Sequence, residues 1–241
     1  GVVTAIELEL YEEPEIYAGA LLFPPERAGE VLRAWRTWAD TVPDEVTSIG
    51  RYIRVPDLEI APEPLRGQSF AVIEATFLGP EGEGAELLAP LRALGPAMDT
   101  FGMVGPEALL ALHMDPPEPV PGLGAGGMLV DLTDEVIDAV DATIGAGTSS
   151  PLLTFEFRHL GGALARRGSG ALGSLDGAFL TYGAGLVTGP EVVAAITERL
   201  GAVHDALAPV AGGRPYMNFT EEEADASALF EPAAYERLRS V

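Results

Sequence analysis

Two short stretches of the sequence combine polar and aromatic side chains in patterns that could do chemistry. The first is FEFRHLGGAL (155–164), in which Glu156, Arg158 and His159 stand together before a double glycine. In a strand, successive side chains point to opposite faces, so Glu156 and Arg158 share one face, and His159 lies with two phenylalanines on the other. This polar face predicts either a simple ion pair or the lining of a pocket.

The second stretch is RPYMNF (214–219), which follows a long amphipathic segment. If it is a strand, Tyr216 and Asn218 share one face, and Met217 and Phe219 share the other. A buried tyrosine and asparagine need hydrogen-bond partners, and a polar heteroaromatic ring would supply them. The edge of a flavin ring carries such donors and acceptors, so this stretch is a candidate flavin contact.

Other kinds of site find little support in the sequence. The three histidines, His113, His159 and His204, stand far apart and lack the spacing of metal ligands, so no metal site is predicted. There is no cysteine and no GxSxG nucleophile motif. The glycine-rich GLGAGG (122–127) follows no apolar strand and opens no helix, which argues against a dinucleotide loop.

The charge of the chain excludes further classes of partner. The 241 residues carry a formal net charge of −23, and all 14 basic residues are arginines. Such a field repels phosphate backbones and anionic lipids, so we expect neither a nucleic acid nor a membrane surface as partner. No apolar run reaches the roughly 18–20 residues of a membrane span, and no signal peptide is visible; the location of the protein stays unassigned.

Hydrophobic periodicity predicts the elements that must position these residues. Trp35 and Trp38 fall on the apolar face of a helix and are predicted to be core residues, and Thr133 is predicted to cap the helix that follows it. The expected strands cover 1–10, 15–23, 46–55, 69–79, 98–104, 127–132, 152–160 and 177–187. The expected helices cover 26–40, 82–95, 106–113, 134–144 and 190–210.

The order of these elements predicts the fold class. Pairs of strands are followed by single helices, and the strict strand–helix alternation of a doubly wound sheet is missing. This order favours an α+β fold, in which a mostly antiparallel sheet carries helices packed on one face. The segment 115–127, rich in proline and glycine, is predicted to be a long loop rather than a linker between domains.

Three segments, in this order, resemble the berberine bridge enzyme-like oxidoreductases, which are FAD-linked oxidases of the vanillyl-alcohol oxidase superfamily. The opening GVVTAIELEL resembles the strand that follows a Gly-Asn-Phe turn at the end of the flavin-binding domain. FRHLGGAL resembles the family's strand ending in a double glycine, and YMNF resembles its Tyr-x-Asn-Tyr signature beside the flavin. Their order and separation carry the resemblance across essentially the whole chain.

The resemblance implies that residues 1–241 are the substrate-binding domain, an antiparallel sheet that roofs the flavin ring. The FAD-binding domain would precede Gly1 and a closing segment would follow Val241; both are expected to be absent from this segment. The implied partners are an FAD-binding domain, on the same or a separate chain, and a small-molecule substrate. The implied activity removes hydride from an alcohol, a sugar or a C–H centre and passes the electrons to oxygen, and the segment alone is expected to be inactive.

The resemblance also implies cofactor-binding positions. Gly1, Val2 and Val3 match the strand whose backbone approaches the FAD, and Tyr216 and Asn218 match residues that lie against the flavin or support that contact.

The position of Phe219 departs from the family pattern. Many relatives carry a tyrosine there, and that tyrosine is a proposed base for the substrate hydroxyl. Phenylalanine cannot take a proton, so either another group does this work, with Tyr182, Glu156 and His159 as the catalytic candidates, or the substrate needs no base. Arg158 and Phe219 are expected to line the substrate pocket.

A different class of function also accounts for the sequence. The chain could be a self-contained small-molecule-binding module or a catalytically dead pseudo-enzyme, which the missing cofactor motifs and Phe219 favour. A self-contained module should cover the face that holds Tyr216 and Asn218, whereas a substrate domain should leave it open.

Overall fold

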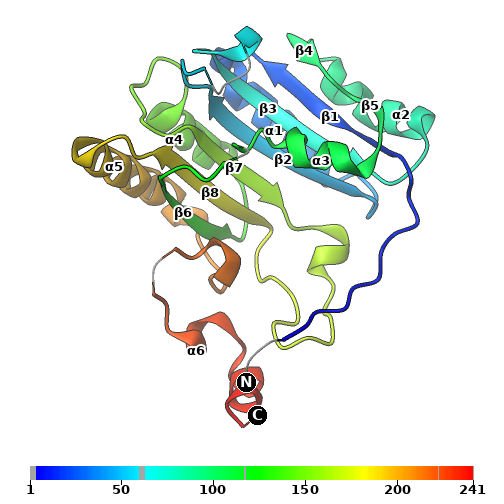
Figure 1. Cartoon of the computed structure of the whole chain (residues 1–241), viewed down its shortest axis with the longest axis vertical. Coiled ribbons are helices and arrows are strands. Elements are labelled where there is room, and N and C mark those ends of the chain that lie inside the picture. The colour runs from blue at the N-terminus through cyan, green and yellow to red at the C-terminus, as the bar shows by residue number, and fades with distance from the viewer. Residues whose placement is uncertain (1–3, 60–62, 117, 222, 241) are drawn as a thin grey trace.

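The computed structural model describes residues 4–59, 63–116, 118–221 and 223–240 of the chain. Within them, eight strands build one antiparallel sheet in the order β4-β1-β3-β2-β7-β8-β6, with β5 also paired to β1 (Figure 1). The strands are β1 Ile16–Phe23, β2 Val46–Arg54, β3 Ser69–Phe77, β4 Met98–Asp99, β5 Gly102–Val104, β6 Gly122–Leu129, β7 Thr154–His159 and β8 Phe179–Leu186. The fold is α+β, as the sequence predicts.

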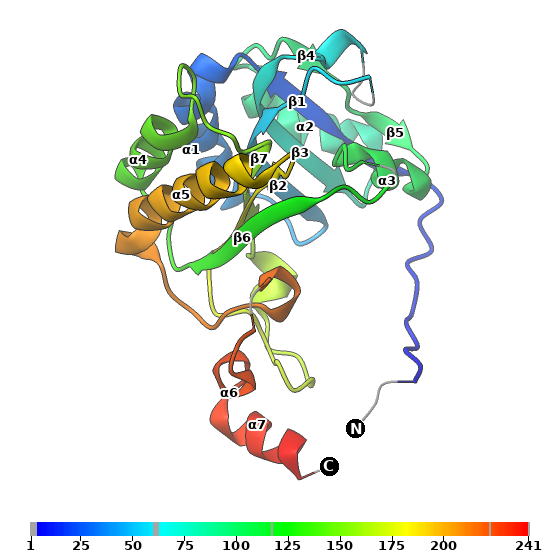
Figure 2. The same ribbon diagram turned by 60° about the vertical axis from the view of Figure 1, so that its left-hand side comes forward.

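Four long helices cover one face of this sheet, and the short helix α3 lies on the other (Figures 1 and 2). The four are α1 Ala28–Ala39, α2 Glu81–Arg92, α4 Asp134–Ile144 and α5 Pro190–Leu207; α3 is Leu109–Leu112, and α6 Ala226–Leu229 and α7 Pro232–Arg239 close the chain. None of the helices within the described ranges has the length and apolar character that a membrane crossing would need.

The main core fills the space between the sheet and the four helices. Trp35 of α1 is fully buried there, and its indole N–H donates to Ser48 Oγ at 3.1 Å. Gly50 of β2 lets this ring approach the strand, because a Cβ at that position would lie 2.7 Å from the indole. Trp38 is also buried, which confirms that both tryptophans are core residues.

Helix α4 begins where the sequence predicts. Thr133 has extended backbone angles and its Oγ1 accepts a hydrogen bond from the Val136 N–H at 3.4 Å. Asp134 and Glu135 occupy the first turn, where negative charge complements the helix dipole. The predicted cap is therefore confirmed.

The predicted first strand is wrong for the residues that the structure describes. Residues 4–10 have no regular secondary structure, and Ile6, Leu8 and Leu10 are 77%, 76% and 87% exposed. An alternating pattern does not make a strand unless another strand satisfies its backbone N–H and C=O groups. Gly1–Val3, the predicted flavin contacts of this segment, lie outside the described residues.

The predicted loop at 115–127 is wrong in its second half. Gly122–Leu129 is strand β6, which pairs along its full length with Phe179–Leu186 of β8. The glycines suggested a loop, but here they serve a strand that other groups approach closely.

The predicted strand at 214–219 is also wrong. Among the described residues, strand pairing between β6 and the chain after α5 is limited to the bridge from Ala211 to Leu129, and Gly213 then takes a positive φ of 89°. Met217–Phe219 forms a single 3-10 turn, closed by the Phe219 N–H donating to the Tyr216 carbonyl at 2.9 Å. Because the segment closes this turn beside β6 instead of running extended along it, no ladder of hydrogen bonds forms.

Candidate functional site

Three neighbouring strands carry charged side chains on the face opposite the long helices. Glu74 lies on β3, Arg51 on β2 and Glu156 on β7, and Arg51 stands directly opposite Glu156 in the ladder. They are only 3%, 2% and 1% exposed. Buried charges are costly unless they are paired, so the contacts of these three residues decide what they do.

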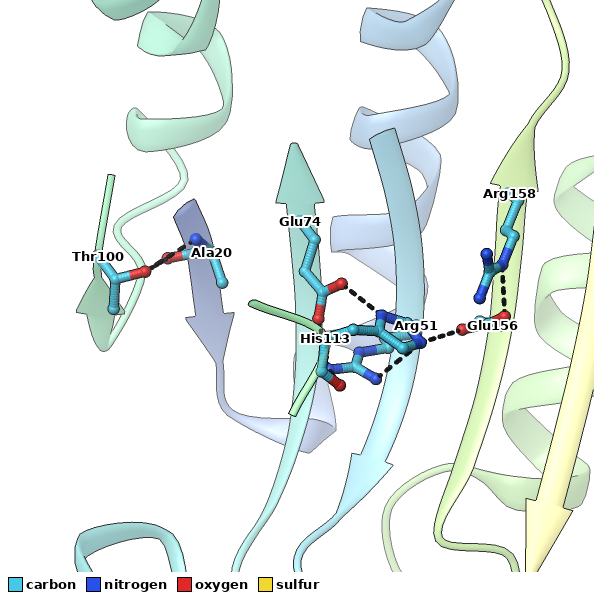
Figure 3. A network of polar contacts seen from close by, with 7 residues as sticks. All are labelled: Ala20, Arg51, Glu74, Thr100, His113, Glu156 and Arg158. Atoms are coloured by element: carbon cyan, nitrogen blue, oxygen red, sulfur yellow. Dashed lines mark hydrogen bonds and ion pairs between the residues drawn. The ribbon is translucent and has the colours of Figure 1, made fainter. Parts of the chain in front are cut away.

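His113, at the C-terminal end of α3, completes their pairing (Figure 3). Its Nδ1 lies 2.7 Å from Glu74 Oε2, and its Nε2 lies 3.0 Å from Glu156 Oε2. Arg51 forms an ion pair with Glu74 and donates from Nη2 to the His113 carbonyl at 3.0 Å. Arg51, Glu74, His113 and Glu156 together form the buried ionic cluster, which binds α3 to three strands.

The electrostatics of the cluster favour its charged form. Burial opposes protonation of His113, but hydrogen bonds to Glu156 and Glu74 outweigh it and raise the pKa of the imidazole to about 9. Burial would raise the pKa of Glu156, but hydrogen bonds from His113 and Arg158 lower it. At neutral pH, His113 is therefore a cation and Glu156 an anion, which makes Glu156 a poor proton acceptor.

Arg158 extends from this cluster toward a group of aromatic rings. Its Nε donates to Glu156 Oε1 at 2.6 Å, which confirms the predicted ion pair. Its guanidinium carbon lies 4.9 Å from the centre of the Phe219 ring, within the range of a cation–π contact. One third of the Arg158 side chain stays exposed, at 33%. Arg158 thus joins a buried region to an open one.

The aromatic rings come from β8 and from the turn that follows α5. Phe219 meets the edge of Tyr182 at 5.6 Å and stacks on Tyr216 at 5.8 Å between ring centres. These three residues are called the aromatic shelf. Tyr216 and Phe219 pack over an apolar patch of the sheet composed of Met128, Leu160 and Leu180. Asn218 of the same turn is exposed, and its side chain makes no hydrogen bond to any other described residue.

The glycines of β6 make room for the shelf. A Cβ at Gly126 would lie 2.8 Å from the Phe219 carbonyl oxygen, and a Cβ at Gly124 would collide with the Tyr182 hydroxyl. The glycine-rich run that suggested a loop therefore lets the 214–219 segment and Tyr182 approach the strand.

Tyr182 is hydrogen-bonded to an acidic residue that follows the shelf. Its hydroxyl donates to Glu221 Oε1, and the Gly124 N–H donates to Glu221 Oε2 at 3.3 Å. Burial raises the pKa of Tyr182, and the hydrogen bond and charge of Glu221 and the charge of Glu156 raise it further. Tyr182 is therefore a neutral phenol over the whole physiological range.

Five of the predicted site residues meet on one face of the sheet, whereas His159 lies on the other. The five are Glu156, Arg158, Tyr182, Tyr216 and Phe219. His159 points to the helix face, where its ring lies 5.6 Å from Phe179 of the main core and burial lowers its pKa. It cannot act together with Glu156 or Tyr182, because the sheet lies between them.

Sequence reasoning missed four residues of this region: Arg51, Glu74, His113 and Glu221. Both Glu74 and Arg51 were detectable: Glu74 is the single charge of strand β3, and Arg51 interrupts the uncharged run SIGRYI of strand β2. His113 ends a short helix and Glu221 follows a single turn, and no local pattern points to either of them. Among the described residues, no group of three or more histidine or acidic side chains is placed to hold a metal ion.

Comparison with known proteins shows which structures share this fold. No family model matches the sequence, and no curated protein matches it. Solved structures do match. BBE-like 1 from Physcomitrella patens superimposes with a TM-score of 0.74 at 13% identity, over 95% of this chain and 51% of that chain. A chitooligosaccharide oxidase superimposes with a TM-score of 0.70 at 13% identity, over 94% of this chain and 52% of that chain.

A variant of berberine bridge enzyme also matches, with a TM-score of 0.65 at 10% identity, over 86% of this chain and 43% of that chain. The chain thus has the fold that its sequence resemblance predicts. It spans about half the length of the solved structures that it matches.

Proposed function

We propose that residues 1–241 are the substrate-binding domain of an FAD-dependent oxidoreductase. The complete enzyme removes hydride from an alcohol, a sugar or a C–H centre and passes the electrons to oxygen. The observation that carries this proposal is the structural similarity to oxidases over about half of their length. The other half of such an enzyme, on the same or a separate chain, would hold the FAD.

The open side of the sheet fits a flavin ring in its chemistry. Tyr216 is only partly buried, and the exposed amide of Asn218 offers both a donor and an acceptor without a partner among the described residues. A flavin edge carries complementary donors and acceptors. A self-contained module should cover these two residues, so their exposure favours the substrate domain over that alternative.

The residues of this chain would bind and orient the substrate, while the flavin, when bound, supplies the hydride acceptor. Arg158 and Phe219 line the pocket, and the N–H groups of Arg158 suit a carbonyl or anionic group on the substrate. Glu156 was a catalytic candidate from the sequence, but both of its oxygens are occupied by His113 and Arg158. We assign it to positioning Arg158, and Tyr182 to the proton step.

The direct test compares the 241-residue chain with the same chain joined to an FAD-binding domain. With added FAD, the chain alone should bind the cofactor weakly and release no hydrogen peroxide from a panel of sugars and benzylic alcohols. The joined protein should release peroxide with at least one of them. Peroxide production by the chain alone would contradict the proposal, and a joined protein that binds FAD without turnover would indicate a pseudo-enzyme.

A simpler measurement asks whether an FAD-binding domain lies on the same chain. An immunoblot of the native source, with antibody against this segment, reports the mass of the intact protein. A band near twice 25.2 kDa supports a flavin domain on the same chain, whereas a band at 25.2 kDa requires a separate flavin-bearing partner.

A further inference from the structure

We propose that Glu221 is the proton acceptor of this site and that it receives, through Tyr182, the proton that a substrate hydroxyl loses. The inference rests on the proposed function and adds to it a residue that neither the sequence patterns nor the resemblance singles out. It also answers how the reaction can proceed although Phe219 occupies the position of a tyrosine base.

The geometry places the two groups in one hydrogen-bonded line. The Tyr182 hydroxyl donates to one oxygen of Glu221, and the Gly124 N–H holds the other at 3.3 Å. Tyr182 also meets the edge of Phe219, whose ring contacts Arg158. The phenol therefore lies between the proposed substrate pocket and an exposed carboxylate, which can release a proton to water.

The surroundings of Tyr182 explain why it needs an acceptor. Glu156 stands opposite it on β7 and Glu221 lies beyond it, while β6 contributes only Gly124 and Gly126 at this position. Both charged neighbours are negative, and they oppose formation of a phenolate. Tyr182 can therefore take a proton only if it gives up its own at the same time, and Glu221 is the group in contact that can receive it.

With an alcohol substrate, two protons move together. The substrate O–H bond breaks as a new bond forms to Tyr182 Oη, while the original Tyr182 O–H bond breaks and its proton joins the Glu221 carboxylate. The hydrogen on the neighbouring carbon would leave with two electrons, for which the FAD of the proposed function would be the acceptor, and the substrate would become a carbonyl compound. Glu221 then loses its proton to solvent, which restores the starting state.

The first test needs neither FAD nor substrate. Labelling the 241-residue chain with 3-fluorotyrosine lets ¹⁹F NMR follow each phenol at a lower pH than unmodified tyrosine requires, and Tyr182→Phe identifies the signal of Tyr182. Glu221→Gln should move the titration midpoint of Tyr182 to lower pH, because it removes a nearby negative charge. Glu223→Gln, an exposed change two residues further on, should leave the midpoint unchanged. An unchanged midpoint in Glu221→Gln would overturn the contact.

The second test uses the chain joined to an FAD-binding domain and an alcohol that it oxidises. Tyr182→Phe and Glu221→Gln should each lower kcat by about 100-fold with little change in KM, and should reduce its dependence on pH. The double variant should be no slower than either single variant, because the two residues act as one unit. Glu223→Gln should keep the wild-type rate.

The outcomes distinguish the proton relay, which is the transfer through Tyr182 to Glu221, from the proposed function. Wild-type kcat in Glu221→Gln would overturn the relay while leaving the proposed function standing. A protein that binds FAD and oxidises none of the panel would overturn the proposed function and the relay with it, even if the NMR titration finds Tyr182 and Glu221 coupled.

Discussion

The buried ionic cluster and the aromatic shelf lie side by side on one face of the sheet, and Arg158 touches both. In the cluster, strands β2, β3 and β7 supply charges that are almost completely buried and paired with one another or with His113. In the shelf, the rings are partly exposed, and the neighbouring amide of Asn218 has no partner within the part of the chain that the structure describes.

This difference indicates that the cluster stabilises the fold and that the shelf contacts the ligand. A charge that is buried and fully paired cannot easily bind or release a substrate, but it fixes the elements that carry it. A partly exposed ring or amide adds little to stability and is free to contact a ligand. We therefore expect substitutions in the cluster to destabilise the fold, and substitutions in the shelf to alter chemistry at little cost in stability.

The sharpest test of the comparison removes one charge from the cluster. Arg51→Ala leaves Glu74 buried without its ion-pair partner, which should lower the free energy of unfolding by about 3–5 kcal/mol. Urea denaturation of the 241-residue chain measures this. As a control, Arg166→Ala breaks an exposed ion pair with Asp44 and should cost about 1 kcal/mol or less. Equal effects of the two changes would show that burial of the cluster does not matter.

The second test uses the pH dependence of the cluster. The pKa of His113 rises from about 6.5 in the unfolded chain to about 9 in the folded one, so its contribution is complete below pH 6.5 and is lost as pH rises through 9. The loss should be on the order of 3 kcal/mol. Unfolding measured from pH 6 to pH 10 should show the wild type losing its advantage over His113→Gln across this range.

A control for this pH effect is the exposed His204. His204→Gln leaves the cluster intact and should therefore retain the loss of stability between pH 6 and pH 10. If the His113→Gln curve instead runs parallel to that of the wild type, the imidazole does not change its charge within the cluster in this range.

A third change tests whether the shelf depends on the glycines of β6. Gly126→Ala brings a Cβ to 2.8 Å from the Phe219 carbonyl oxygen and 2.9 Å from that of Thr181, so it should destabilise the chain by about 1–3 kcal/mol. Gly122→Ala in the same strand meets nothing closer than 3.9 Å and should have little effect. Comparable thermal unfolding of the two variants would mean that the turn at 217–219 is not held against β6.

The smallest expected effect on stability belongs to the shelf itself. Tyr182→Phe removes one hydroxyl from a partly exposed ring and should change the free energy of unfolding by about 1 kcal/mol or less, although it should abolish most turnover in the joined protein. Unfolding and turnover measured on the same preparation check both parts. A loss of stability as large as that of Arg51→Ala would place Tyr182 among the structural residues.

Much of the scaffold follows from local patterns in the sequence. The alternation of β7 correctly placed Glu156 and Arg158 on one face and the phenylalanines on the other. The spacing of Trp35 and Trp38 correctly predicted a core helix. These predictions succeed because a strand repeats every two residues and a helix every 3.6, so a buried face leaves its period in the sequence.

The errors share one cause: a local pattern carries no information about which other segment of the chain will pair with it. Residues 4–10 alternate as a strand does, yet nothing among the described residues pairs with them. RPYMNF became a turn because it closes a hydrogen bond within itself beside β6. The glycine-rich segment before Leu129 became a strand because it pairs fully with β8.

The sequence by itself determined the α+β class, the main helices, the shared face of Glu156 and Arg158, and a resemblance that the fold confirms. Only the tertiary structure decided that His113 lies between Glu74 and Glu156, that His159 lies behind the sheet, and that Glu221 reaches Tyr182. The physical reason is that these contacts join segments far apart in the chain, brought together by the burial of other side chains. Periodicity records which face of an element is buried, and the packing of elements decides which polar groups then meet.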